Sequence, residues 1–490
     1  MTSGAAEPLT DDPVEVSAEA APSVEERLRT ENAALKETVA TLMARVAELE
    51  RRLGLNSGNS GKPPSSDGLK KPPRTSSLRE PSGKKPGGQK NHKGETLRQV
   101  DKPDVTIDHF PGKCSGCNSK LSVSDSISHN ARQVFDLPEP QPLLVTEHRA
   151  HTCRCDLCGA QTRADFPETV TAPVQYGPRL FGVVLYLLHY QLLPEDRLAE
   201  LMADLFNVRL ATATIARMSE TCAGRFQGFV DRVCALIKAA AVKHLDETGF
   251  RIGGKTQWLH IACTLWLTFY RVSPKRGSLM DGVTGIIVHD HWKPYYTMEG
   301  VLHALCNAHH LRELHALVEI EKEPWALRMK RLLRRACHAA NIARDHKTPL
   351  KPVLVEMFKR RYDAIIVEGL AFHEDQPPLV AKPAKGVGKR RGRPPRRTGH
   401  NLLDRLKTRK EDVLRFLTDS AVPFTNNLAE QAGRMMKLRQ KISGGFRSEQ
   451  GAKNFAVIRS LIATAKKQGW SVINTLAQTP ELLLTRLRTA

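Results

Sequence analysis

The stretch AAAVKHLDET (residues 239–248) decides the fold of this chain, because it leads an apolar run into an acidic residue, Asp246. A second apolar run, GIIVHDHW (285–292), does the same at Asp290. Short apolar runs followed by polar or turn residues predict buried strands. Carboxylates at the carboxyl ends of such strands lie where open α/β sheets bind their ligands. We therefore expect each strand to end at its aspartate and the two carboxylates to converge.

A third acidic residue, Glu430, lies in PFTNNLAEQAGRMMKLRQK (423–441), which predicts a helix. Two strand-end aspartates and one helical glutamate supply hard oxygen ligands for two Mg²⁺ ions. Two such ions about 4 Å apart activate a water and stabilise the leaving oxygen of a phosphodiester. Each acid also has a structural alternative. The aspartates can cap the turns after their strands, and Glu430 can close a capping box with Asn427.

The predicted helix also carries cations that follow Glu430 at i+4, i+7 and i+11, namely Arg434, Lys437 and Lys441. These spacings place the acid and the three cations on one helix face. Such a face suits a metal ligand flanked by phosphate contacts, so these three residues are predicted DNA-binding residues. A solvated stripe of charge is the alternative.

The composition points to a polyanionic partner. The 490 residues contain 74 Lys and Arg against 52 Asp and Glu, a net charge of +22, and leave room for two to four domains. Such an excess favours nucleic acid over a membrane. The longest apolar run, LFGVVLYLL (180–188), is too short to span a bilayer. Ten Cys without an export signal favour reduced thiols and metal binding. We expect a cytoplasmic protein with no membrane partner.

The N-terminal third begins with residues 1–23, rich in Ala, Pro and acids, for which we expect disorder. Residues 24–54 repeat apolar side chains in two heptad registers, which predicts a coiled coil and a parallel homodimer. The alternative is one amphipathic helix packed on its own protein. Residues 55–106 form a basic linker rich in Gly, Pro and Ser. The heptad positions are Leu28, Leu35, Leu42 and Leu49, with Asn32, Val39, Val46 and Leu53.

Two CxxC pairs predict a zinc-ribbon-like module over residues 107–165. Four thiolates make a closed tetrahedral site for one structural Zn²⁺. Cys153 complicates the second pair, but only Cys155 has the CxxC spacing. The runs RQVFDL (132–137) and PLLVTEHRA (142–150) resemble strands that join the two pairs. The predicted ligands are Cys114, Cys117, Cys155 and Cys158.

Two further segments carry weaker DNA-binding signals. Residues 166–238 are predicted to be helical and resemble a helix-turn-helix, although any helical hairpin has this pattern. Residues 382–397 form a loop with many cations and no acid. Within it, Arg391-Gly392-Arg393-Pro394 matches the core of an AT-hook, in which both arginines enter a narrow minor groove. A non-specific basic loop is the alternative. The side chains proposed for the recognition helix are Thr212, Thr214 and Arg217.

The segments TQWLHIACT (256–264) and LTFYRVSP (267–274) predict a meander after the first strand, and VLHALCNA (301–308) predicts a further short strand. The segments HLDETGFRI, GIIVHDHWKPYY, HALCNAHHLRELHAL and VPFTNNLAEQAGRMMKLRQKISGGFRS resemble the DDE transposases of bacterial insertion sequences. Among these, the chain is most similar to the insertion sequence sixty-six family. The resemblance covers several unrelated modules in the order of the family. One departure is Gln431, where such sequences often have Arg.

The resemblance implies a multidomain α+β protein with an RNase H-like α/β catalytic domain. Its core would comprise residues 239–312 and 421–490, and residues 313–420 would form a helical insertion. Asp246, Asp290 and Glu430 would be the catalytic triad.

The family's CNAHHLREL stretch makes His309 and Arg312 candidates for phosphate contacts or for support of the site. A His-rich metal site built from His289, His291, His309 and His310 is a further alternative, against a mixture of core, surface and DNA-contacting histidines.

The resemblance also implies an activity. The enzyme would cut the 3′ ends of its element and join them to double-stranded target DNA, with terminal repeats as the other DNA partner. Accessory proteins of the same element are possible partners, and the protein would associate with the bacterial nucleoid. A non-catalytic repressor and a nuclease on the same fold are the rival functions.

Overall fold

The structure is a computed structural model that describes residues 23–55, 98–136, 143–376 and 396–489. The chain divides into two compact units. The predicted tail, most of the linker and most of the basic loop, including Arg391 and Arg393, lie outside the described residues. The first unit joins residues 1–75 to 304–425, and the second joins 76–303 to 426–490.

A five-stranded sheet forms the centre of the second unit, in the order β5-β4-β3-β6-β7. The first three strands form the predicted antiparallel meander, and β6 joins β3 in parallel. The prediction that Asp246 ends its strand is wrong. The strand continues for six residues because Phe250 and Ile252 resume the apolar alternation on the face of Asp246. The strands are β3 (Val242–Ile252), β4 (Lys255–Cys263), β5 (Thr268–Ser273), β6 (Gly285–His289) and β7 (Val301–Leu305).

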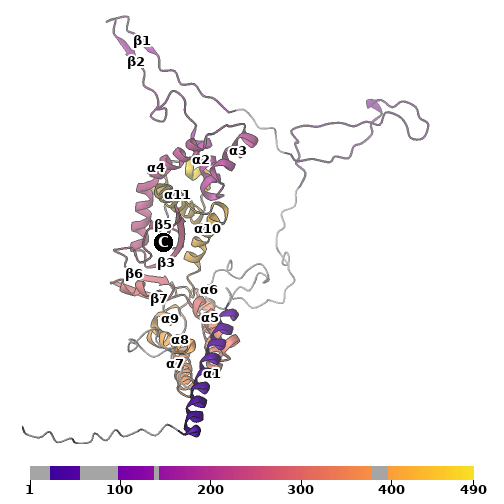
Figure 1. The fold of residues 1–490 in the computed structure, drawn as a ribbon. Coiled ribbons are helices and arrows are strands. Elements are labelled where there is room, and N and C mark those ends of the chain that lie inside the picture. Colours follow the sequence, from indigo (N-terminus) through magenta and orange to yellow (C-terminus); the bar gives the residue numbers. More distant parts are fainter. Residues whose placement is uncertain (1–22, 56–97, 137–142, 377–395, 490) are drawn as a thin grey trace, which may run out of the picture. The chain divides into compact units, whose positions relative to one another are not determined.

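Helices cover both faces of this sheet (Figure 1). On one face, Leu245 and Ala262 pack with α4 (Thr212–Ala239). On the other, Phe250 and Ile261 pack with α10 (Asn427–Ser443). Side chains alternate between the faces of a strand. The face of β3 that carries Asp246 is therefore the face covered by α10.

The outer edge of the sheet is closed by α11 (Glu449–Lys467). Thr464 Oγ1 accepts a hydrogen bond from the Thr268 amide and donates one to its carbonyl, at 3.1 Å each. Ser460 Oγ accepts a hydrogen bond from the amide of Tyr270 at 2.9 Å. An edge strand presents unpaired backbone groups, and these contacts satisfy them.

The predicted helices before the sheet are present. They are α2 (Pro178–Leu185), the π-helical turn η3 (Tyr186–Tyr190), α3 (Glu195–Phe206) and α4. Asn207, in the left-handed conformation (φ 54°), ends α3. The start of α4, where the recognition helix is predicted, belongs to a helix of 28 residues whose inner side lies in the core. DNA readout by this helix stays a prediction. The second unit also contains three short helices, η4 (Lys293–Thr297), α12 (Val472–Ala477) and α13 (Pro480–Thr485).

The first unit contains the predicted helical insertion. Tyr362 Oη on α7 (Pro352–Glu374) donates to the carbonyl of Leu406 on α8 (Thr398–Thr408) at 3.0 Å. The side-chain Nδ2 of Asn307 on α5 (Asn307–Ala316) donates to the carbonyl of Val413 on α9 (Lys410–Thr418) at 2.9 Å. The helices are α5 (Asn307–Ala316), the π-helical turn η5 (Leu317–Glu321), α6 (Pro324–Asp345), α7 (Pro352–Glu374), α8 (Thr398–Thr408) and α9 (Lys410–Thr418).

The predicted coiled-coil segment forms one helix of 31 residues, α1 (Val24–Gly54). Its apolar heptad positions are exposed, from 45% at Leu49 to 78% at Leu53. This single chain therefore does not bury the apolar stripe. No helix in the described part of the chain combines the length and apolar character needed to cross a membrane.

Candidate active site

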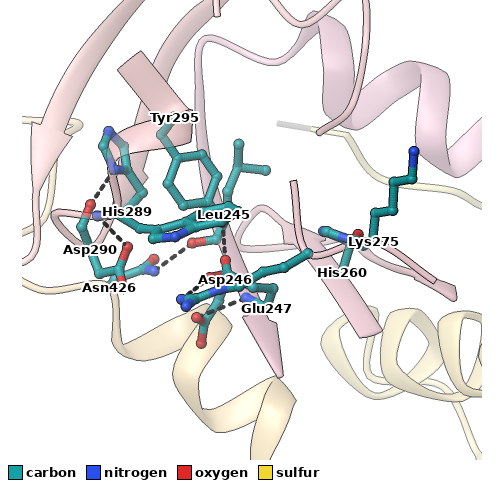
Figure 2. Close-up of polar contacts among 11 residues, drawn as sticks. Leu245, Asp246, Glu247, His260, Lys275, His289, Asp290, Tyr295 and Asn426 are labelled. Atoms are coloured by element: carbon teal, nitrogen blue, oxygen red, sulfur yellow. Dashed lines mark hydrogen bonds and ion pairs between the residues drawn. The ribbon is translucent and has the colours of Figure 1, made fainter. Parts of the chain in front are cut away.

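The parallel pairing of β3 with β6 brings Asp246 and Asp290 side by side. His244 pairs with Val288. Two residues further along, the same register reaches Asp246 on β3 and Asp290 directly after β6. Neighbouring strands are about 4.8 Å apart, so the two partly buried carboxylates lie at one level of the sheet (Figure 2).

Asn426 fixes the start of α10 to β3. Its Oδ1 accepts a hydrogen bond from His244 Nδ1 at 2.9 Å, and its Nδ2 donates to the Leu245 carbonyl at 2.7 Å (Figure 2). Burial lowers the pKa of His244 to about 4, so this ring is neutral at pH 7. The backbone carbonyl of Asn426 accepts from the amide of Glu430 at 3.1 Å, which places Glu430 in the first turn.

The capping box considered for Asn427 and Glu430 does not form. The N-cap residue of α10 is Asn426, and no side chain caps this helix. The side chain of Asn426 is turned to β3 because its two polar atoms satisfy a buried imidazole and a strand carbonyl there.

Gly433 lets α10 approach the acidic side chains closely. A Cβ atom at this position would lie 3.0 Å from Ile261 Cδ1 and 4.0 Å from Asp246 Oδ2. Glu430 is one helical turn before this contact, so α10 carries the third acid toward the two aspartates. Tyr270 Oη holds the same helix by donating to the carbonyl of Ala432 at 3.0 Å.

The electrostatics show that the three acids repel one another. Burial, followed by the charge of Glu247, raises the pKa of Asp246 to about 8, and the charges of Asp290 and Glu430 contribute to this rise. Burial also raises the pKa of Asp290 to about 6, with contributions from Glu247 and Glu430. A cation at this place would remove the repulsion and would displace a proton from Asp246.

The donor set suits hard divalent cations such as Mg²⁺, which prefer carboxylate oxygens. Taken alone, the described residues of the second unit contain no three His, Cys, Asp or Glu ligand atoms within 4.8 Å of one another. Asp246, Asp290 and Glu430 therefore do not close on a single point. A wider spacing is compatible with a pair of ions about 4 Å apart.

A fourth carboxylate, Glu247, lies next to the predicted acids and was missed from the sequence. Its side chain is 1% exposed and pairs with Arg276 Nη2 at 2.6 Å. Tyr295 Oη donates to its other oxygen at 2.5 Å (Figure 2). These partners are 29 and 48 residues away in the chain, so no local pattern reveals the pairing. Glu247 is thus held by the half-exposed Arg276 and the buried Tyr295.

Arg276 ties the two acid-bearing segments together. Its guanidinium lies 4.3 Å from the centre of the Trp292 ring and 5.1 Å from that of Trp258. The Trp292 amide donates to Asp290 Oδ1 at 3.0 Å. A single cation thus bridges Glu247 on β3 to the turn that holds Asp290.

The histidines of the second unit do not form a metal cluster among themselves in its described part. His289 is buried, and its Nε2 lies 3.0 Å from His303 Nδ1. It also contacts the rings of Tyr295 and Tyr296. These contacts make His289 part of an aromatic cluster beside the sheet. His309 and His310 lie on α5 of the first unit, as does Arg312.

The three predicted cations of α10 are exposed. Lys437 Nζ donates to the carbonyl of Gly249 at 2.9 Å, and partial burial lowers the pKa of this lysine. Lys437 therefore lies against β3, three residues beyond Asp246.

The two CxxC segments fold into turns with the same hydrogen bonds. The amide of Cys114 donates to the Ser119 carbonyl at 2.9 Å, and that of Cys155 donates to the Ala160 carbonyl at 2.8 Å. The residue after each second Cys, Asn118 or Gly159, is in the left-handed conformation. Such turns expose two sulfurs on one side, which is what a zinc knuckle requires.

Cys153 lies outside the second turn. It sits in β1 (Thr152–Arg154), which pairs with β2 (Gln161–Arg163), and its Cα partner is Thr162.

Hydrogen bonding to Ser119 lowers the pKa of Cys117 to about 7. The described residues do not gather the four predicted sulfurs within 4.8 Å, so each turn is defined separately.

The strands predicted between the turns are absent from their described parts, residues 132–136 and 143–150. Val134 and Leu144 are 90% and 94% exposed. Their apolar side chains have no sheet or core to pack against, so the apolar pattern does not become a strand here.

The chain is similar to known proteins over most of its length. The model of the Transposase IS66 family matches residues 173–454, which include all three acids. A Family of unknown function (DUF6444) matches residues 6–98. The uncharacterized protein y4hP of Sinorhizobium fredii is 23% identical over 411 residues, which cover 75% of this chain and 69% of that protein.

Proposed function

Because the chain belongs to the Transposase IS66 family, we propose that it is a DDE transposase whose triad is Asp246, Asp290 and Glu430. The observation that carries this proposal is the β3–β6 register, which sets the two aspartates side by side. The packing of α10 over that place through Gly433 supports Glu430 as the third acid. The strand order, with a meander followed by a parallel strand, supports an RNase H-like domain.

The proposed chemistry is two successive phosphoryl transfers. Water adds to the phosphorus at the element end, and the 3′ oxygen leaves as a hydroxyl. That 3′ hydroxyl then attacks a phosphodiester of the target, whose own 3′ oxygen leaves. Bound Mg²⁺ ions would supply activation of the attacking oxygen and stabilisation of the leaving one.

The protein's own residues prepare the site for this chemistry. Asp246, Asp290 and Glu430 would hold the two ions, and the raised pKa of Asp246 means that ion binding releases a proton. Asn426 and Gly433 position α10, and Arg276 keeps Glu247 and Asp290 in place. Preorganised groups of this kind cost no rearrangement at the moment of reaction.

The remaining modules would handle DNA and assembly. The exposed heptad stripe of α1 supports a homodimer that processes both element ends together. The two CxxC turns would share one structural Zn²⁺. Arg434, Lys437 and Lys441, with Arg391, Arg393, His309 and Arg312, would contact double-stranded DNA. We propose a cytoplasmic, nucleoid-associated protein, with accessory proteins of the element as further partners.

A strand-transfer assay tests this proposal. The full chain is incubated with labelled element ends, supercoiled plasmid and Mg²⁺, alongside Asp290→Ala. We expect joined products from the wild type and none from the variant. Cleavage without joining would favour a nuclease, or show that an accessory protein is needed. Equal DNA binding by both proteins without cleavage would instead support a repressor.

A further inference from the structure

A strip of cations leads away from the acids along α10 and β3, which run in the same direction. Gly433 lies against Asp246, and Lys437 reaches the carbonyl of Gly249. At the end of the helix, the Phe446 amide donates to the carbonyl of Arg251 at 3.0 Å. Helix and strand therefore stay in contact from the acids to the tip of the β3–β4 hairpin.

The hairpin tip and the turn after α10 are rigidly joined. The Gly253 amide donates to the Phe446 carbonyl at 3.0 Å. Gly253 and Gly254 both have positive φ, 52° and 79°, as a two-residue hairpin turn requires. A Cβ atom at Gly445 would lie 2.5 Å from the Arg251 carbonyl oxygen, so only glycine permits this approach.

The strip has one sign of charge. Residues 248–263 and 431–448 contain no Asp or Glu. Arg439 turns inward, 4.2 Å from the centre of the Phe446 ring, and is the one cation on α10 that does not contribute. The exposed members are Arg434, Lys437, Lys441 and Arg447 on and after α10, with Arg251 and Lys255 at the hairpin tip.

We propose that this strip binds the sugar–phosphate backbone of the DNA that flanks the cut, with the hairpin tip as its far end. The inference rests on the proposed function, because the acids define where the cut lies. Arg434 to Lys441 spans roughly 10 Å at 1.5 Å per residue. Phosphates of one strand follow every 3.4 Å or so along the duplex axis, so α10 spans about three of them. The hairpin tip extends the track by one or two more.

We expect recognition by the strip to be independent of sequence, because contacts to phosphates carry no sequence information. The apolar face of α10, including Ala429 and Met436, is buried against the sheet. The helix therefore cannot lay that apolar face on another partner, and the rest of its surface exposes the three cations together with Leu438 and Ile442.

The salt dependence of binding tests the hairpin tip. Full-length wild type, Arg251→Ala and Lys255→Ala bind a labelled duplex with Ca²⁺ in place of Mg²⁺, over a range of KCl concentrations. Removing one cation that binds a phosphate should reduce the slope of log K against log salt by about one. Arg232→Ala, which removes an exposed cation from α4, is the matched control and should keep the wild-type slope.

Wild-type slopes in both tip variants would overturn the proposal. Lys255→Gln removes the charge but keeps a long side chain, so it should reduce the slope as Lys255→Ala does. A thermal unfolding curve of each variant shows whether a reduced slope reflects misfolding instead. Failure of the strip is distinguishable from failure of the proposed function. A wild type that cuts DNA while Arg251→Ala and Lys255→Ala both keep the wild-type slope rejects only the strip. A wild type that never cuts, while Lys255→Ala has a reduced slope, rejects only the transposase chemistry.

Discussion

Replacing Asp246 with asparagine should stabilise the metal-free second unit at high pH, although it removes a proposed metal ligand. Burial, followed by repulsion from Glu247, raises the pKa of Asp246 from 3.8 to about 8. A carboxyl with a higher pKa in the folded than in the unfolded protein opposes folding as the pH rises. The stability contributed by the protonated carboxyl is therefore complete below about pH 4 and is lost as the pH approaches 8.

The size of the effect follows from this shift. One pKa unit corresponds to about 1.4 kcal/mol, so a shift from 3.8 to about 8 has an upper bound of roughly 6 kcal/mol. Asparagine has nearly the same shape as aspartate. It can still accept the hydrogen bond that the Glu247 amide donates to Asp246 Oδ1 at 2.9 Å. Near pH 9, the free energy of unfolding of Asp246→Asn should exceed that of the wild type by a large part of this amount. At about 2–4 °C per kcal/mol, its Tm should rise by roughly 10 °C.

Thermal unfolding in EDTA at several pH values between 5 and 9 measures this directly. The gap in Tm between Asp246→Asn and the wild type should widen with pH. Asp281→Asn, which changes an exposed aspartate of the same unit, should show no such trend. Added Mg²⁺ should stabilise the wild type and narrow the gap. A lower Tm for Asp246→Asn at pH 9, or a gap independent of pH, would refute the reasoning.

Substitutions at four other places should also have measurable effects. Arg276→Ala leaves Glu247 buried without its cation, so unfolding should cost about 3 kcal/mol less and kcat should fall about 100-fold with KM little changed. Arg276→Lys should restore only part of the stability and only part of kcat, because a lysine side chain cannot stack between the two indoles as arginine does. Gly433→Leu should lift α10 from Ile261, abolish joining and destabilise the unit by about 1–3 kcal/mol in denaturant unfolding. Leu42→Glu should convert a dimer to a monomer in analytical ultracentrifugation, whereas an unchanged mass would reject the coiled coil. Cys117→Ser should lose the one zinc per chain that elemental analysis is expected to find in the wild type.

The sequence predicts the presence of the acid-bearing strands well because each contains a short apolar run next to its aspartate. Asp246 and Asp290 each follow such a run, and the structure places each run in the sheet. The predicted end of the first strand is wrong because an acid inside a strand looks like a boundary. Asp246 is tolerated there since it faces Gly433 and its neighbouring acids, where no apolar side chain is required.

Other features depend on partners that sequence spacing does not reveal. The pairing of Glu247 with Arg276 and Tyr295 joins three separate segments of the chain. Between the CxxC turns the sequence predicts strands that do not form. Val134 and Leu144 belong to the two runs predicted as strands there, but both side chains remain exposed. An apolar pattern predicts a strand only if the fold supplies something to cover it.

The position of α10 and α11 after all five strands of the sheet has a consequence for protein synthesis. The last strand of the sheet ends at Leu305. The helix that closes the sheet edge, α11, and the helix that carries Glu430, α10, both come later in the chain. A nascent or prematurely terminated chain that stops before Asn426 therefore carries α1 and both CxxC turns without a complete acidic centre. If those modules dimerise and bind DNA as proposed, such fragments would occupy element ends and pair with full-length chains. Incomplete translation would then produce an inhibitor of the active protein.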